Sequence, residues 1–224
     1  MTMTSTRIQE IKNALSHARM GTYENATDSA GNRISTEQAL SLYAWNAQVS
    51  AALLAPLHIC EVVIRNAVSA ALEAQYGSRW PWSPGFEQSL PSPHQGYNPR
   101  RDLQDARRSA NTTGKVIPEL KFAFWQSMFT SRHDSRLWNN YLTQVFPNLP
   151  TGQTVQQSRL DIYHELENLR KLRNRIAHHE PIFGRNLPED FNKINDLITI
   201  RCAITAAWMQ QNQQASSFIS SRPL

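Results

Sequence analysis

Apolar residues recur every three or four positions along most of this chain, which is the spacing that places them on one face of an α-helix. The stretches with this pattern cover residues 35–76, 101–111, 120–129, 135–146, 155–177 and 188–208. No stretch of useful length alternates between apolar and polar residues, as a half-buried β-strand would. The pattern therefore predicts an all-α fold.

The first helical stretch has a clear start, a clear end and a proline between them. Ser35 and Gln38 have the spacing of a capping box, in which each side chain bonds the backbone N–H of the other residue. Pro56 has no N–H to donate to the helix, so the stretch forms either a helical hairpin or one kinked helix. Gly77 follows the last apolar residue and can adopt the left-handed conformation that ends many helices.

The clearest helix is predicted over residues 155–177. One apolar stripe runs along it, made of Ile162, Leu166, Leu169, Leu172 and Ile176. Pro181 stops this pattern. A last helix is predicted to open near Pro188, because proline is favoured in the first turn of a helix.

Residues 79–101 lack any helical repeat and contain five prolines, which predicts a long Pro-rich loop. The loop also carries Trp80, Trp82, Tyr97, Arg100 and Arg101. Its tryptophans could pin it to the surface, or its rings and guanidinium groups could grip RNA by stacking and charge. We favour the pinned surface loop.

The pattern divides the chain into three parts. Residues 1–34 form an N-terminal helix and linker, and residues 35–210 form one helical domain that includes the loop. Residues 211–224 are rich in Gln and Ser, so we predict a flexible tail there.

The charge of the chain favours an anionic partner. Its 23 Lys and Arg residues outnumber its 18 Asp and Glu residues, which gives a formal net charge of +5. Nucleic acid is the partner class that this balance indicates first. Arg132, His133 and Arg136 form a basic cluster that we interpret as a solvated face.

Cysteine usage and hydropathy predict a soluble, cytoplasmic protein. Cys60 and Cys202 each lie in an apolar helical pattern, so we expect neither a disulfide nor a metal site from them. The first residues lack the apolar core of a signal peptide. The most apolar stretch, residues 51–64, contains Pro56, His58 and Glu61, so we predict no membrane helix and no membrane partner.

Two motif-like runs do not support the chemistry that they suggest. Thr113, Gly114 and Lys115 lack the first glycine of a phosphate-binding loop, because Ser109 stands at its position. His178 and His179 are adjacent and would point about 100° apart on a helix, whereas two zinc ligands on one helix need a spacing of four. We therefore predict no metal and no cofactor.

Chemistry-bearing side chains gather at the end of the helix predicted over 155–177. Basic residues are favoured there by the unpaired carbonyls, so the cluster could be no more than a helix cap. The alternative is RNA cleavage: an imidazole, with a pKa of about 6.5, can accept the 2′-hydroxyl proton or donate one to the leaving oxygen, and Arg173 can hold the phosphate. Arg173 and His178 would converge only if the helix ends before His178, because a step of five residues turns about 140°.

The run from Arg173 to His179 resembles the R-x4-6-H signature of HEPN domains. Four other segments, residues 39–46, 61–67, 122–125 and 179–183, are similar in order to the Abi-like (abortive infection) family of that superfamily. The resemblance spans roughly residues 12 to 208. It departs from the family at Ala123, which stands where a glycine is expected.

The resemblance implies an all-α, HEPN-like helical bundle that cleaves RNA without a metal ion, in phage defence or a toxin–antitoxin system. Arg173 and His178 match the ends of the signature, and Asn174 is its usual polar neighbour. The doubled histidine leaves open whether His178 or His179 is catalytic. The flanking basic residues expected to bind RNA are Arg170, Lys171 and Arg175.

The expected partners are RNA, a second copy of the chain and a cognate antitoxin. A twofold dimer would supply a second Arg/His set, because such an interface presents the same patch twice. Some HEPN proteins only bind RNA or other proteins, so the alternative is a non-catalytic RNA-binding or protein-interaction module. A third reading is a helical oligomerisation protein without a role in nucleic-acid binding.

Four residues on the first helical stretch are candidate supporting residues. Glu61 and Arg65 are four apart, which suits a salt pair, and Asn66 follows them. They form either a buried structural ion pair or a set in which Glu61 or Asn66 orients the side chains of the Arg173/His178 helix. The same two readings apply to Asn46, where we favour the structural one.

Overall fold

The protein's structure is a computed structural model that describes residues 4–28 and 30–224. Over these residues the fold is all-helical, and its only non-helical pairing is an isolated bridge between Thr27 and Arg33. The predicted all-α class is therefore confirmed.

Helices of very different length make up the described chain. They are α1 (Ser5–Leu15), α2 (His17–Glu24), α3 (Thr36–Tyr76), α4 (Pro84–Ser89), α5 (Pro99–Arg107), α6 (Thr113–Val116), α7 (Phe122–Ser127), α8 (Asn139–Val145), α9 (Val155–Ala177), α10 (Leu187–Arg201), α11 (Ala203–Gln211) and α12 (Ala215–Ser220). Single 3-10 turns, η1 (Trp80–Trp82), η2 (Ile117–Glu119) and η3 (Ser131–His133), and a π-helical turn, η4 (Asp134–Trp138), lie between them.

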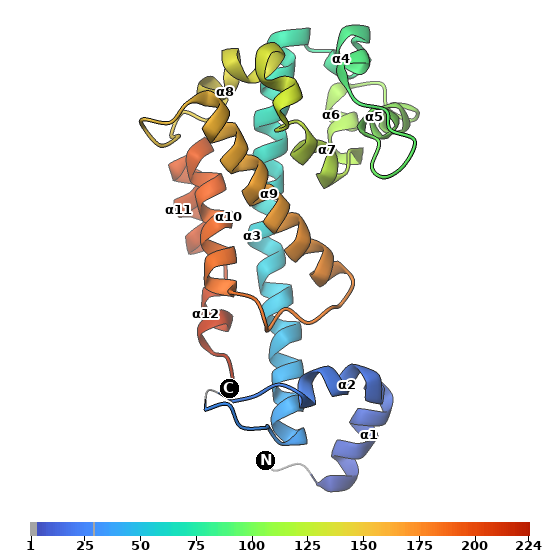
Figure 1. Ribbon diagram of the computed structural model, residues 1–224, viewed down its shortest axis with the longest axis vertical. Helices are drawn as coiled ribbons and strands as arrows, with labels where there is room; N and C mark the ends of the chain where they lie inside the picture. The colour runs from blue at the N-terminus through green and yellow to red at the C-terminus, as the bar shows by residue number, and fades with distance from the viewer. Residues whose placement is uncertain (1–3, 29) are drawn as a thin grey trace.

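Helix α3 runs almost the full length of the molecule, and other helices pack along it, namely α2, α7, α8, α9, α10 and α12 (Figure 1). Its capping box at Ser35 and Gln38 is present as predicted. The helix continues through Pro56, so the hairpin alternative is excluded. A proline inside a helix costs about 3 kcal/mol, and the burial of Leu53 and Leu57 on either side of it offsets this, at roughly 1.5–3 kcal/mol per side chain.

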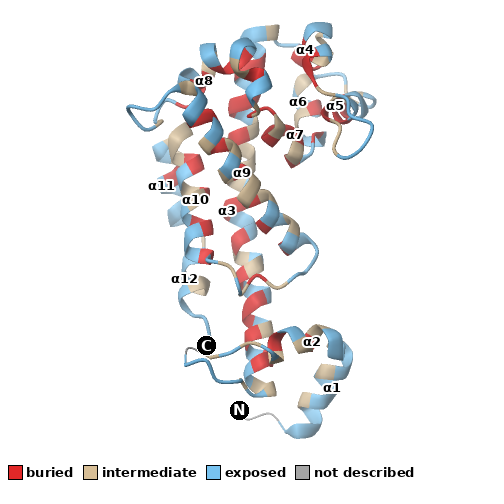
Figure 2. Cartoon of the chain, in the orientation of Figure 1, coloured by how far each residue is buried: buried red, intermediate tan, exposed pale blue. Residues whose placement is uncertain are grey.

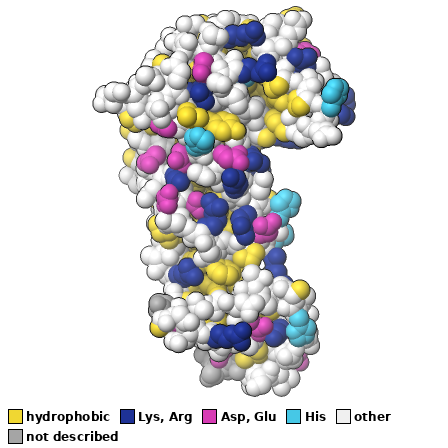
Figure 3. All heavy atoms as spheres, in the orientation of Figure 1, with side chains coloured by type: hydrophobic (Ala, Val, Ile, Leu, Met, Phe, Trp, Pro, Cys, Tyr) yellow, Lys and Arg dark blue, Asp and Glu magenta, His cyan; other side chains and the backbone are white. Residues whose placement is uncertain are grey.

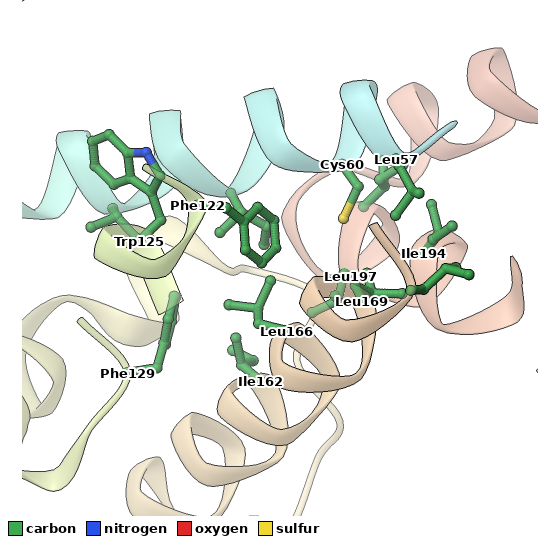
Figure 4. Packing of buried hydrophobic residues seen from close by; sticks show 14 of the residues in the cluster. Leu57, Cys60, Phe122, Trp125, Phe129, Ile162, Leu166, Leu169, Ile194 and Leu197 are labelled. Carbon is green, nitrogen blue, oxygen red and sulfur yellow. The ribbon is translucent and has the colours of Figure 1, made fainter. Parts of the chain in front are cut away.

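The core lies where α3, α9 and α10 meet, with α7 completing it (Figure 4). Buried residues form a stripe along each of these helices (Figure 2). The stripe predicted for α9 faces this core, and α9 has the predicted bounds of 155–177. The packed side chains include Leu57 and Cys60 of α3, Phe122 and Trp125 of α7, Leu166 and Leu169 of α9, and Ile194 and Leu197 of α10.

The Pro-rich segment is more ordered than a loop. It contains η1, α4 and the start of α5, so the prediction of one long loop over 79–101 is wrong at both ends. Trp80 is completely buried and its indole N–H donates to the Ser69 hydroxyl at 3.1 Å. Arg100 donates to the carbonyls of Gln88 and Leu90. Burial of Trp80 therefore holds this segment against the rest of the protein, as we expect for a loop pinned by its tryptophans.

The C-terminal part also differs from the prediction. The last helix is interrupted at Cys202, whose backbone is extended, and so forms α10 and α11. Where the sequence predicts a flexible tail, the structure has α12, which packs against α3. The indole N–H of Trp45 donates to the carbonyl of Phe218 at 2.7 Å, and Ala215 is completely buried. Contacts with a distant helix, which a local pattern does not reveal, stabilise this short helix.

The cluster at residues 132–136 is a solvated face only in part, because Arg132 and Arg136 are exposed as predicted and His133 is buried. His133 is only 3% exposed, and burial together with the charges of Arg132 and Arg136 lowers its pKa to about 4. The chain therefore buries this imidazole in its neutral form, at the junction of η3 and η4. The next residue, Asp134, forms an ion pair with Arg159 at 3.0 Å.

Helix α3 is also long and apolar enough to cross a membrane, since one 18-residue window has a mean hydropathy of 1.7. A core helix of a soluble protein passes the same test, and 33% of the window is buried here. This is weak evidence for a membrane span, and the cytoplasmic location stays a prediction.

Candidate functional site: a pocket at the end of α9

A pocket of about 500 Å³ lies between α2, α3 and the C-terminal end of α9. We call it the α9-end pocket. Its charged and aromatic lining residues come from segments far apart in sequence: Arg19 and Tyr23 from α2, Tyr43 from α3, Arg173 from α9, and His179 and Glu180 from the turn after α9. The site therefore exists only when the N-terminal helices, α3 and α9 are packed together.

The turn after α9 explains how His179 reaches this pocket. His178, which caps the helix, has φ −91° and ψ 10°, whereas His179 has a positive φ of 56°. The N–H of His179 donates to the carbonyl of Ile176 at 3.0 Å, and that of Glu180 donates to the carbonyl of Arg175 at 2.7 Å. These two bonds define a Schellman motif, in which the left-handed position is usually glycine. The turn reverses the chain at His179.

His178 and Asn174 are not among the residues that line this pocket. The backbone N–H of His178 still donates to the carbonyl of Asn174 at 2.9 Å, so the helix does not loosen before His178. The step of about 140° that separates Arg173 from His178 on a helix therefore remains. The structure brings together Arg173 and His179 rather than Arg173 and His178.

Arg173 is paired with Glu61 across the interface between α9 and α3. Its Nε lies 3.4 Å from Glu61 Oε2, with the side chains 44% and 21% exposed. Glu61 therefore pairs with Arg173 and not with Arg65, contrary to the predicted salt pair. The carboxylate lies where it can orient the guanidinium, as in the alternative reading of these residues. A half-exposed pair of this kind contributes little to stability, about 0–1 kcal/mol.

Two of the other supporting candidates have less specific surroundings. Asn66 is exposed on α3. Arg65 is half-buried, and its Nε has no hydrogen-bond partner among the described residues. Neither lines the α9-end pocket.

Asn46 has a structural role at the floor of the site. It is 6% exposed, and its Oδ1 accepts a hydrogen bond from the N–H of Ile182 at 2.8 Å. That N–H follows the helix-ending Pro181 and is buried, so it would otherwise be unpaired at a cost of about 1–3 kcal/mol. Asn46 fixes the chain just after the His179 turn, which agrees with the favoured structural reading.

The basic residues around the signature all contact groups of the protein itself. Arg170 and Lys171 both pair with Glu167, at 2.9 Å and 3.5 Å. Arg175 donates to the carbonyl of Pro181 at 3.2 Å and lies 3.5 Å from Glu180. Their side chains stay 33–60% exposed, so their charges still reach solvent.

Charges of both signs mix on the face that carries α9. Figure 3 shows Lys and Arg side chains beside Asp and Glu side chains along the middle of the molecule. The surface therefore has no single-sign stripe on this face, and the α9-end pocket itself is lined by two arginines, Arg19 and Arg173, together with Glu180.

Arg19, Tyr23 and Tyr43 are site residues that the sequence did not indicate. The Arg19 guanidinium donates to the backbone carbonyl of His179 and lies 6.0 Å from the centre of the Tyr43 ring. Burial raises the pKa of Tyr23 to about 12, so its phenol stays neutral at physiological pH. No sequence spacing links residue 19 to residue 179, so no local signal could have found this contact.

Comparisons with known proteins add no relative: no family model, no curated protein and no solved structure matches the chain. The function must therefore be argued from the geometry of the α9-end pocket and from the resemblance of the sequence segments.

Proposed function

We propose that the protein is a metal-independent endoribonuclease of the HEPN type, whose reaction centre is the α9-end pocket. The observation that carries this proposal is that Arg173 and His179 line the same pocket. A guanidinium and an imidazole are the two groups needed to hold a phosphodiester and to move a proton beside it. A volume of about 500 Å³ suits one nucleotide.

In the proposed reaction the 2′-oxygen of the RNA forms a bond to the neighbouring phosphorus as the bond from phosphorus to the 5′-oxygen breaks. The imidazole of His179 takes the 2′-hydroxyl proton, and Arg173 stabilises the charge that develops on the phosphoryl oxygens. Glu61 holds the Arg173 guanidinium at the pocket edge. The products are a 2′,3′-cyclic phosphate and a 5′-hydroxyl end.

The leaving 5′-oxygen must take up a proton, and a single His179 serves only one of the two transfers at a time. A homodimer that joins two α9-end pockets would supply a second imidazole from the same sequence. Sedimentation equilibrium tests this part of the proposal, and a protein that is monomeric at its active concentration would contradict it.

The direct test incubates the purified chain with mixed RNA in excess EDTA and determines the chemistry of the product ends. Cleavage to cyclic phosphate ends is expected for the wild type, and a loss of about 10²–10⁴ in rate is expected for His179→Ala. Arg173→Ala is expected to lose activity as well. His164→Ala is the matched control, because His164 is an exposed imidazole on α9 outside the pocket.

His178→Ala decides between the two adjacent histidines. Loss of cleavage in this variant, with activity kept in His179→Ala, would transfer the proton-transfer role to His178. A wild type that retains RNA but does not cleave it would indicate the non-catalytic binding module. A chain that retains no RNA at low salt would indicate an oligomerisation protein, because phosphate contacts bind more tightly as salt falls.

We also propose that this activity serves phage defence or a toxin–antitoxin pair, on the strength of the resemblance in sequence. Expression of the wild type should then arrest the growth of a bacterial host, and expression of Arg173→Ala should not. Equal growth with both would contradict the proposed setting.

A further inference from the structure

Arg19 is the one cation that reaches the α9-end pocket from the N-terminal helices, among the described residues that line it. It lies on α2, which packs against α3 through the buried residues Met20 and Tyr23. The half-buried ion pair between Lys12 and Glu24, at 2.7 Å, joins α1 to α2. The packing of α2 against α3 and its ion pair to α1 therefore determine the position of Arg19.

The contact that Arg19 makes is with the backbone of the turn that carries His179. Its guanidinium donates to the carbonyl of His179. This carbonyl belongs to His179, the residue with the positive φ. The N–H groups of His179 and Glu180 make the two hydrogen bonds of the Schellman motif. A non-glycine residue in this conformation is strained, and such positions persist when surrounding contacts hold them.

We propose that Arg19 is a positioning residue that clamps the His179 turn and so holds His179 at the pocket that Arg173 also lines. The inference rests on the proposed function for its catalytic consequence, although the clamp itself is a property of the fold. Because a hydrogen bond with a charged donor is stronger than a neutral one, the guanidinium is the group suited to this task. The Tyr43 ring, 6.0 Å away, limits the directions that the guanidinium can take.

The first measurement needs no RNA. Residue-resolved hydrogen exchange compares the amides of His179 and Glu180 in the wild type, in Arg19→Ala and in Arg7→Ala. Arg7 is an exposed arginine on α1 and serves as the matched control. Exchange at both amides should become faster in Arg19→Ala, on the order of tenfold, and should not change in Arg7→Ala. Unchanged exchange in Arg19→Ala would overturn the clamp, whether or not the protein cleaves RNA.

The second measurement separates positioning from substrate binding and from folding. Arg19→Ala should lower kcat roughly tenfold with little change in KM, a smaller loss than that of His179→Ala. Arg19→Lys keeps one charged donor and should recover part of kcat. A rise in KM at constant kcat would instead mean that Arg19 binds the RNA, and faster exchange with unchanged kcat would mean that the clamp is only structural. Either result overturns the positioning role.

An inert wild type that shows the exchange difference would contradict the endoribonuclease while leaving the clamp in place. Failure of the proposed function and failure of the clamp are therefore distinguishable.

Discussion

The His179 turn offers a test of the fold and of the site at one residue. With a φ of 56°, His179 adopts the left-handed conformation. That conformation costs an L-residue roughly 1–2 kcal/mol, although histidine tolerates it better than most side chains. The side chain is exposed, so its truncation removes little buried surface. Glycine relieves this strain. It also makes the unfolded chain more flexible, which lowers the free energy of unfolding by about 0.5–1 kcal/mol.

Two variants, His179→Gly and His179→Ala, therefore separate the strain from the chemistry. Both lack the imidazole, and only the glycine variant lacks the strain. We expect His179→Gly to be more stable than His179→Ala by about 1 kcal/mol. For a chain of this size that difference raises Tm by roughly 2–4 °C.

Calorimetry of the two variants measures the strain, and RNA cleavage in EDTA measures the chemistry. We expect the glycine variant to melt at the higher temperature while both variants lose cleavage. Equal Tm values would refute the left-handed end of α9. Cleavage by either variant at the wild-type rate would refute the role of His179.

Three further predictions concern the rest of the fold. Asn46→Leu leaves the buried N–H of Ile182 unpaired and should lower the free energy of unfolding by about 1–3 kcal/mol in urea denaturation; a smaller loss would contradict the anchoring role. Because the pKa of His133 falls from 6.5 to about 4 on folding, the unfolded chain binds more protons in this range. Stability should therefore be lost as pH falls from about 6.5 to 4, by on the order of 3 kcal/mol, and His133→Gln should remove this part of the pH dependence. Deletion of residues 213–224 should expose Trp45 and shift its fluorescence to longer wavelength, whereas an unchanged spectrum would show that α12 does not cover it.

The parts of the fold that local patterns determine were predictable. Helix α9 has the predicted bounds because its apolar stripe repeats along the helix itself and Pro181 lies four residues beyond its last residue, Ala177, so both signals are local in sequence. The start of α3 was predictable from Ser35 and Gln38 for the same reason. The continuity of α3 through Pro56 was not, because it depends on packing against helices distant in sequence.

The candidate site was predictable in part. The sequence indicates Arg173 and the adjacent histidines, and it relates Glu61 to Arg173 as one of two readings. It does not separate His178 from His179, because the choice depends on the sign of one backbone dihedral angle. Glycine would have marked the left-handed position, and here a histidine occupies it. Arg19 lies outside any local pattern, since 160 residues separate it from His179 along the chain.

In the proposed reaction Arg173 and His179 act as one unit in the α9-end pocket. A double-mutant cycle on kcat/KM for RNA cleavage in EDTA tests it most directly, with Arg173→Ala, His179→Ala and the double variant. We predict that the double variant is hardly slower than the slower single variant, because either loss alone disables the unit. Losses that multiply in the double variant, or a wild type without cleavage, would contradict the claim.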